Sequence, residues 1–197
     1  CIDYLGLIKN YFRFSAFVPC DPNQTDRIIR YIACEPGNHF VGMGRSKTPT
    51  ITKEDGSVFY DADYVFTPGK ADWLRQGTDA TIITYGAVTP ACIEAWQILK
   101  DAGKSVGVLN MASLIPMDVD AVIEAAGIGP IVTVEDHHVE TGLGSSVAVA
   151  LLDKGLAPKM QRLGVRQYGG SGSPADLYKQ QGLDGASIAA TVQGLID

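Results

Sequence analysis

Residues 40–49 hold the side chains of this chain that are best suited to chemistry. A short apolar run ends at Gly42 and Gly44, and Arg45 follows directly. Pro49 then stops the loop from continuing as regular structure. The pattern predicts a buried strand that delivers Arg45 at its carboxyl end, where open α/β sheets bind ligands. Because a guanidinium forms paired charged hydrogen bonds with phosphate or carboxylate, Arg45 indicates an anion site. The alternative is an ion pair with an acidic residue of the next loop.

A second dense cluster of polar residues lies at 135–146. It consists of the Glu-Asp-His-His run of residues 135–138 and the glycine-containing segment 142–146. This order places acids and imidazoles at a strand end, next to a helix N-terminus that attracts anions. A metal site and a nucleotide site are two alternatives. The adjacent His137 and His138 cannot easily point at one ion, however, and the glycine segment is shorter than a dinucleotide fingerprint. We favour a loop whose charged groups accept hydrogen bonds from the helix N–H groups or meet a partner surface.

No catalytic set can be assembled from the remaining polar residues. The chain has three histidines, so options for acid–base chemistry are few. The Gly/Ser loop of residues 169–174 has a structural explanation, with Ser173 as helix N-cap and Pro174 at the first helical position.

The composition predicts a compact α/β protein. Hydrophobic residues make up 46% of the 197 residues and charged ones 19%. The net charge of −6 has no basic block, which argues against binding to nucleic acid or to an anionic membrane surface. There is no apolar run of eighteen residues and no visible signal peptide, so we expect a cytoplasmic protein. The four cysteines form no C-x-x-C pair and are expected to be buried, reduced thiols: Cys1, Cys20, Cys34 and Cys92.

Residues 1–48 are predicted to form the closing part of a doubly wound domain. Residues 2–8 resemble the end of a helix, and a strand is expected at 15–19 and another at 39–43. Between them, Asp21 and Pro22 open a helix whose apolar face is predicted to comprise Ile28, Ile29, Ile32 and Ala33. Because the chain starts at Cys1, without a methionine and in a helical pattern, we expect it to be a fragment.

A linker and a second domain are predicted to follow. Residues 49–79 form the linker, with a hairpin turn at Asp55-Gly56. In residues 80–197, strands alternate with helices, which is typical of βαβ units. We expect a three-layer α/β domain with a mostly parallel five-stranded sheet, which includes strands at 80–86, 105–110, 130–135 and 160–165 and helices at 117–126 and after 142.

In combination, these segments resemble the transketolase family. Residues 15–21 and 42–49 resemble the end of its pyrimidine-binding domain. Further segments resemble its C-terminal domain: 69–71 with 74–77, 81–86, and 134–137 with 141–145. The similarity covers essentially the whole chain, and the shorter form of the family, whose N- and C-terminal halves can be separate subunits, is the best match.

The resemblance implies transfer of a two-carbon ketol unit between sugar phosphates. It also implies thiamine diphosphate with Mg²⁺ or Ca²⁺ in the complete enzyme, a partner domain or subunit that binds this cofactor, and a homodimer. Arg45 matches the arginine that binds the terminal phosphate of the sugar.

Several family residues have no counterpart in this sequence. The glutamate and stacking aromatic for the aminopyrimidine, the His and Asp for substrate hydroxyls, and the diphosphate and metal motif all belong upstream of Cys1. Thr141 stands where glycine is common. We therefore expect no catalytic, cofactor or metal residue here, and no activity from this chain alone. The alternatives are the β-type half of a 2-oxoacid dehydrogenase, a deoxyxylulose phosphate synthase, or a non-catalytic dimer-assembly domain. The Gly-Arg-Ser-Lys-Thr-Pro segment favours transketolase, because a short 2-oxoacid does not need the arginine.

Overall fold

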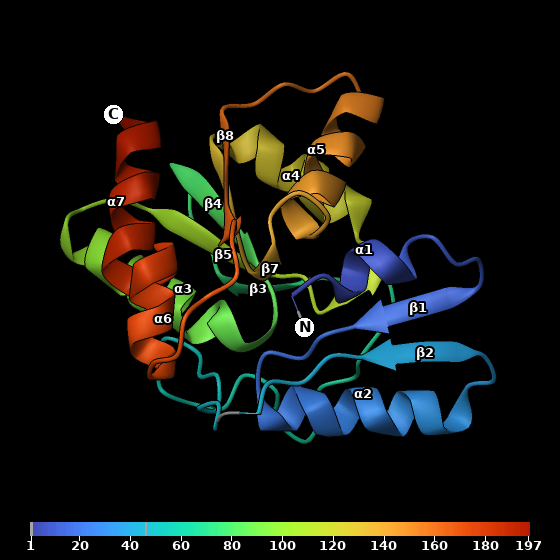
Figure 1. The fold of residues 1–197 in the computed structure, drawn as a ribbon. Helices are drawn as coiled ribbons and strands as arrows, with labels where there is room; N and C mark the ends of the chain where they lie inside the picture. The colour runs from blue at the N-terminus through green and yellow to red at the C-terminus, as the bar shows by residue number, and fades with distance from the viewer. Residues whose placement is uncertain (1, 46) are drawn as a thin grey trace.

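The computed structural model describes residues 2–45 and 47–197. Cys1, and Ser46 next to Arg45, lie outside the described residues. The chain forms a small three-stranded sheet flanked by a helix, and this unit lies beside a larger α/β unit (Figure 1).

The small unit contains the predicted strand, helix and strand. It starts with α1 (Tyr4–Ile8) and continues with β1 (Phe14–Phe17), α2 (Pro22–Cys34) and β2 (Asn38–Val41). Strands β1 and β2 are parallel, whereas β6 (Ser113–Ile115), which comes from the larger unit, pairs antiparallel with β1. The sheet order β2-β1-β6 therefore joins the two units.

Three expectations for this small unit were wrong. Strand β2 is a half-buried edge strand and not a buried one, because among the described residues it pairs with β1 alone. Helix α2 buries Ile28, but Ile29 is 40% exposed and Ala33 is exposed, because only one narrow side of the helix packs on the sheet. Cys34, at the end of α2, is an exposed free thiol, whereas Cys20 and Cys92 are buried as predicted.

The linker contains the predicted hairpin and one strand that was not predicted. The Phe59 N–H donates to the Ile51 carbonyl at 2.9 Å, and Gly56 turns the chain with a φ of 86°. Strand β3 (Asp72–Arg75) then pairs antiparallel with β5 (Val106–Asn110) at the edge of the large sheet. The large sheet thus begins before residue 80. The division into domains at residues 48 and 79 stays a prediction.

The five-stranded sheet confirms the predicted fold class. Its order is β3-β5-β4-β7-β8, with β4 (Ala80–Thr84), β7 (Ile131–His138) and β8 (Met160–Val165) completing it. All pairs are parallel except β3 with β5. Strand β7 is longer than predicted, so His137 and His138 lie in the strand and not in a loop.

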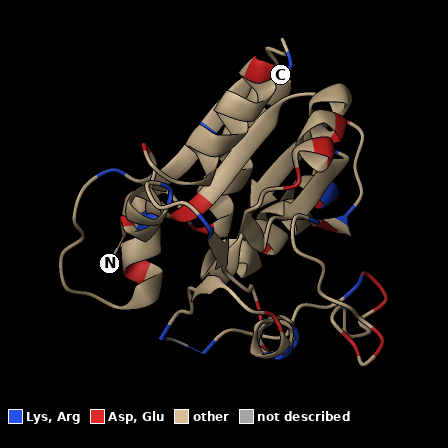
Figure 2. Ribbon diagram, turned by 90° about the vertical axis from the view of Figure 1, so that its right-hand side faces the viewer, with Lys and Arg blue, Asp and Glu red and all other residues tan. Residues whose placement is uncertain are grey.

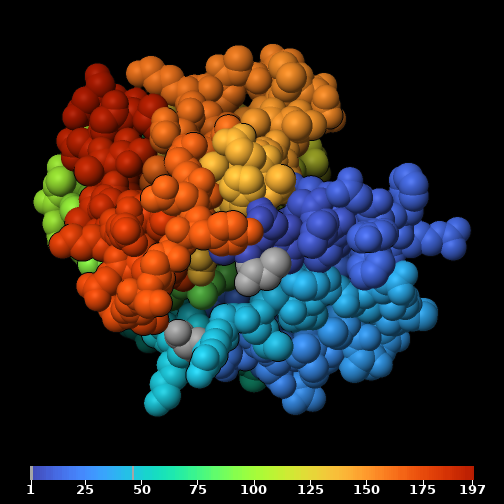
Figure 3. All heavy atoms as spheres, viewed as in Figure 1, coloured from blue at the N-terminus to red at the C-terminus, as the bar shows by residue number. Residues whose placement is uncertain are grey.

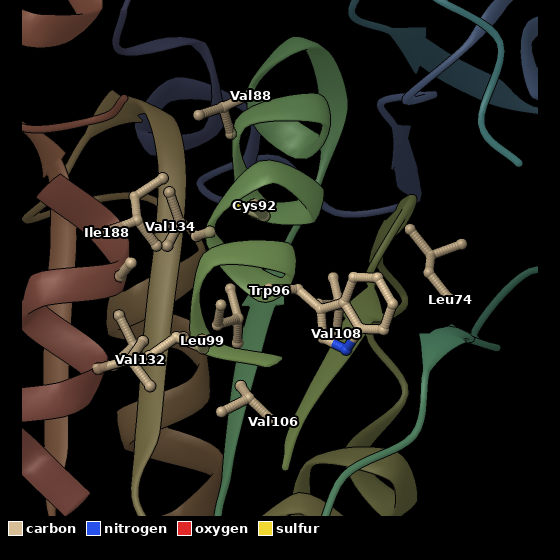
Figure 4. Packing of buried hydrophobic residues seen from close by; sticks show 14 of the residues in the cluster. Leu74, Val88, Cys92, Trp96, Leu99, Val106, Val108, Val132, Val134 and Ile188 are labelled. Atoms are coloured by element: carbon tan, nitrogen blue, oxygen red, sulfur yellow. The ribbon is translucent and has the colours of Figure 1, made fainter. Parts of the chain in front are cut away.

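Helices cover both faces of this sheet. The helices α3 (Thr89–Asp101) and α7 (Gly185–Ile196) pack together on one face, and α4 (Val119–Ile128) and α5 (Leu143–Asp153) on the other (Figure 1). Figure 4 shows Trp96 and Leu99 of α3 directed toward Val106 and Val108 of β5. Helix α4 ends at Ile128, two residues beyond the predicted end at residue 126.

The connections from the two central strands leave on opposite sides of the sheet. A 3-10 turn, η1 (Gly86–Val88), leads from β4 into α3, whereas β7 leads into α5. Such a reversal opens a crevice at the carboxyl ends of the strands. The short helix α6 (Pro174–Gln181), capped by Ser173 as predicted, lies after β8. Within the described residues, no helix is long and apolar enough to span a membrane.

Candidate functional site

Arg45 lies where the small unit meets the crevice of the large sheet. It is exposed in the loop after β2 and lines a cavity of about 620 Å³ together with Lys47. The opposite wall includes Asp136 of β7 and Tyr178 of α6. In Figure 3 the cyan loop around residue 46 lies below the orange α6 segment. The structure therefore places the predicted arginine at the carboxyl side of the parallel strands.

Two cations of one loop share this position. Arg45 and Lys47 line both the large cavity and a neighbouring one of about 510 Å³. Figure 2 shows blue stretches of this loop at the lower left of the view. No ion pair between described residues includes Arg45 or Lys47. Asp136, an acid of the large cavity's wall, already accepts a hydrogen bond from the Tyr178 hydroxyl at 2.8 Å. The described part of the chain thus does not contain the ion pair that was the alternative role of Arg45.

The loop that carries Arg45 is held at both of its ends. The Gly42 N–H donates to the Phe17 carbonyl at 2.9 Å. At the other end, the Ile51 N–H donates to Asp21 Oδ2 at 2.9 Å. Gly44 passes close to η1, since a Cβ added there would lie 3.3 Å from the Ala87 Cβ.

A buried polar network next to this loop joins α2 to the large sheet. Asp72 Oδ2 accepts hydrogen bonds from the Tyr64 hydroxyl at 2.9 Å, the Tyr60 hydroxyl at 3.3 Å and Gln24 Nε2 at 3.2 Å. Asn110 Nδ2 donates to the Tyr60 hydroxyl at 2.7 Å and to Gln24 Oε1 at 3.1 Å. Burial raises the pKa of Asp72 to about 6. The sequence does not reveal this network, because its members come from four separate segments.

The second predicted cluster has a structural role. The buried Glu135 accepts hydrogen bonds from the N–H groups of Leu143 and Gly144, at 2.7 and 2.9 Å, where α5 begins. Burial raises the pKa of Glu135 to about 7, although these hydrogen bonds oppose the shift. The contact between Glu135 and α5 agrees with the interpretation that the sequence favoured, in which charged groups of the cluster accept hydrogen bonds from helix N–H groups.

The two histidines of that cluster have different partners. His137 Nε2 accepts a hydrogen bond from the Leu5 N–H at 3.1 Å, and burial lowers the pKa of this imidazole. His138 Nδ1 lies 2.8 Å from Asp3 Oδ1. Among residues 2–45 and 47–197, no group of three His, Cys, Asp or Glu side chains is arranged to hold a metal ion.

The fold and site together define a class: a two-part α/β protein with a basic loop at the strand-end crevice. The family model described as "Transketolase, C-terminal domain" matches residues 69–188. The chain therefore belongs to the transketolase family, as its motifs predict.

Individual relatives agree with this assignment. A "putative transketolase C-terminal section" of Methanocaldococcus jannaschii is 35% identical over 88% of this chain and 53% of the relative. A 1-deoxy-D-xylulose-5-phosphate synthase of Syntrophotalea carbinolica is 38% identical over 65% of this chain and 20% of the relative. A solved structure described as a split gene transketolase, inactive beta4 tetramer, superimposes with a TM-score of 0.89 and 32% identity, over 100% of this chain and 62% of that one. The chain thus spans between 20% and 62% of the length of these three proteins.

Proposed function

We propose that this chain is the C-terminal portion of a thiamine diphosphate-dependent transketolase, in which Arg45 binds the terminal phosphate of the sugar substrate. The observation that carries the proposal is the position of Arg45. It lies exposed on a cavity at the strand-end crevice, with Lys47 beside it and no ion-pair partner among the described residues. A sugar phosphate ends in a dianion, which needs a cation to replace its hydration.

The two side chains suit that phosphate in different ways. The planar fork of Arg45 can donate two parallel hydrogen bonds to phosphate oxygens, which fixes the orientation of the substrate. Lys47 adds a second positive charge on the same cavity, without a fixed direction. The cavity of about 620 Å³ has room for a whole sugar phosphate, since small-molecule sites range from about 300 to 1,000 Å³.

Among the described residues, no group of three His, Cys, Asp or Glu side chains is arranged to hold Mg²⁺ or Ca²⁺. The proposal assigns the binding of the cofactor to a separate domain or subunit, as the family resemblance implies. We further expect the assembled enzyme to be a homodimer of such pairs. The part of this chain in the reaction is to bind and orient the substrate.

The test is the substitution Arg45→Ala in the assembled enzyme. Loss of a charged hydrogen bond worth about 1.5–3 kcal/mol corresponds to a KM for xylulose 5-phosphate that is raised about ten- to a hundredfold. The KM for unphosphorylated xylulose should stay unchanged. Arg30→Ala is the matched control, because it removes the same charge from an exposed surface of α2. An unaltered KM for xylulose 5-phosphate in Arg45→Ala would contradict the proposal.

A second candidate is a deoxyxylulose phosphate synthase, which is favoured by the 38% identity to the Syntrophotalea carbinolica enzyme. An assay of the complete protein with xylulose 5-phosphate and ribose 5-phosphate separates the two candidates. Ketol transfer between these sugars supports the transketolase proposal. Its absence from an assembled, cofactor-loaded enzyme favours the synthase.

A further inference from the structure

Asp21 makes two separate contacts with its two carboxylate oxygens. Oδ1 accepts a hydrogen bond from the Gln24 N–H at 2.7 Å and so caps α2. Oδ2 accepts a hydrogen bond from the Ile51 N–H at 2.9 Å. The side chain is buried, with 2% of its surface exposed. Capping α2 requires only the hydrogen bond from Gln24. The hydrogen bond from Ile51 is not part of the helix cap.

The second contact fixes the end of the loop that carries Arg45. Between Gly42 and Ile51, the described residues form neither helix nor strand. At the first end, the Gly42 N–H is bonded to β1, and at the other end the Ile51 N–H is bonded to Asp21. Since a chain without regular structure samples many conformations, the position of the guanidinium depends on these two anchors.

We propose that Asp21 is a positioning residue for phosphate binding, which holds the loop so that Arg45 faces the cavity. The inference rests on the proposed role of Arg45. Ile51 is 4% exposed, so its N–H would lose its partner in a buried place if Oδ2 were absent. The loop would then have to move to expose this N–H to water, and Arg45 would move with it.

Asp118 provides a matched control for this proposal. Its Oδ1 accepts a hydrogen bond from the Ala121 N–H at 3.1 Å and caps α4. Its Oδ2 accepts a hydrogen bond from the Ala71 N–H at 3.0 Å. The side chain is also buried, at 6% exposure, and it lines neither cavity that Arg45 lines. Asp118→Ala thus removes the same two kinds of hydrogen bond as Asp21→Ala, away from the phosphate site, together with an ion pair to the exposed Lys70 at 3.8 Å.

The experiment compares these variants in the assembled enzyme. We expect Asp21→Ala to raise the KM for xylulose 5-phosphate about tenfold, since small misplacements of a binding group have effects of this size. The KM for unphosphorylated xylulose should stay within about twofold. Asp118→Ala should lower the melting temperature to a similar extent but leave both KM values within about twofold. In Asp21→Asn, one oxygen remains and cannot serve both N–H groups, so an intermediate KM is expected.

A double-substitution cycle tests whether Asp21 acts through Arg45. In an Arg45→Ala background, Asp21→Ala should cause no further rise in the KM for xylulose 5-phosphate. Amide hydrogen exchange of residues 42–51 gives a readout that does not depend on activity, and it should become faster in Asp21→Ala but not in Asp118→Ala.

The outcomes separate this inference from the proposed function. If Arg45→Ala leaves the KM for xylulose 5-phosphate unchanged, the role of Arg45 fails. If Arg45→Ala raises that KM but Asp21→Ala behaves like Asp118→Ala, only the positioning role of Asp21 is overturned. An equal effect of Asp21→Ala with and without Arg45 would also overturn it.

Discussion

Asp72 offers a prediction whose size follows from the structure. Its Oδ2 accepts three hydrogen bonds, from Tyr64, Tyr60 and Gln24, yet burial raises its pKa from 3.8 to about 6. No ion pair between described residues includes Asp72, so no cation offsets the cost of burying its charge. The substitution Asp72→Asn keeps a hydrogen-bond acceptor for the tyrosines and removes the titration.

The sign of the effect follows from linkage. Because the pKa of Asp72 is higher in the folded than in the unfolded chain, its contribution to stability is fully present below about pH 4. It is lost as the pH rises through about 6. A shift of about two pKa units corresponds to about 3 kcal/mol of unfolding free energy. The stability of Asp72→Asn relative to the unsubstituted chain should therefore rise by up to about 3 kcal/mol between pH 4 and pH 7.5.

Urea unfolding of both proteins at a series of pH values measures this difference. Other titrating groups, such as Glu135 and Asp184, contribute equally to both proteins and cancel. Asp118→Asn is a suitable control, since it replaces another buried carboxylate. A stability difference between Asp72→Asn and the unsubstituted chain that is constant within about 0.5 kcal/mol across this range would refute the reasoning.

Two further predictions concern a glycine and the cofactor. Gly142→Ala should destabilise the protein by about 3 kcal/mol or more, because the added Cβ would overlap Glu135 Oε2 and break its hydrogen bonds to α5. Gly127→Ala should instead stabilise the protein by about 0.5 kcal/mol, because nothing lies within 4 Å of the added Cβ. Thermal unfolding of both variants measures this contrast, and equal melting temperatures would contradict it. This chain by itself should bind thiamine diphosphate negligibly, and calorimetry that detects micromolar binding would disprove that expectation.

Local signals predicted much of the fold correctly. Strands alternating with helices predicted the mostly parallel sheet, because each βαβ unit needs its own apolar strand and amphipathic helix. Helix starts at Pro22 and Pro174 were predicted from the capping residues Asp21 and Ser173, which act within a few residues of themselves. Strands β3 and β6 were missed, since each is short and acquires its partner from a distant segment.

The candidate site was predicted only in part. Arg45 was predicted from its neighbours in the chain, and the structure places it on a cavity at the strand ends. Its strand was predicted to be buried, however, whereas β2 lies at a sheet edge. Burial depends on the packing of the whole chain, so the apolar pattern of a short strand does not decide it.

The amino-acid sequence alone determined the family, the order of most elements and the arginine of the proposed phosphate site. These properties depend on residue types and short spacings along the chain. The tertiary structure decided what surrounds that arginine: the cavity shared with Lys47, the bond from Asp21 to Ile51 and the network around Asp72. These contacts join segments that lie far apart in the sequence, and hydrogen bonds and desolvation act only between groups that folding has brought together.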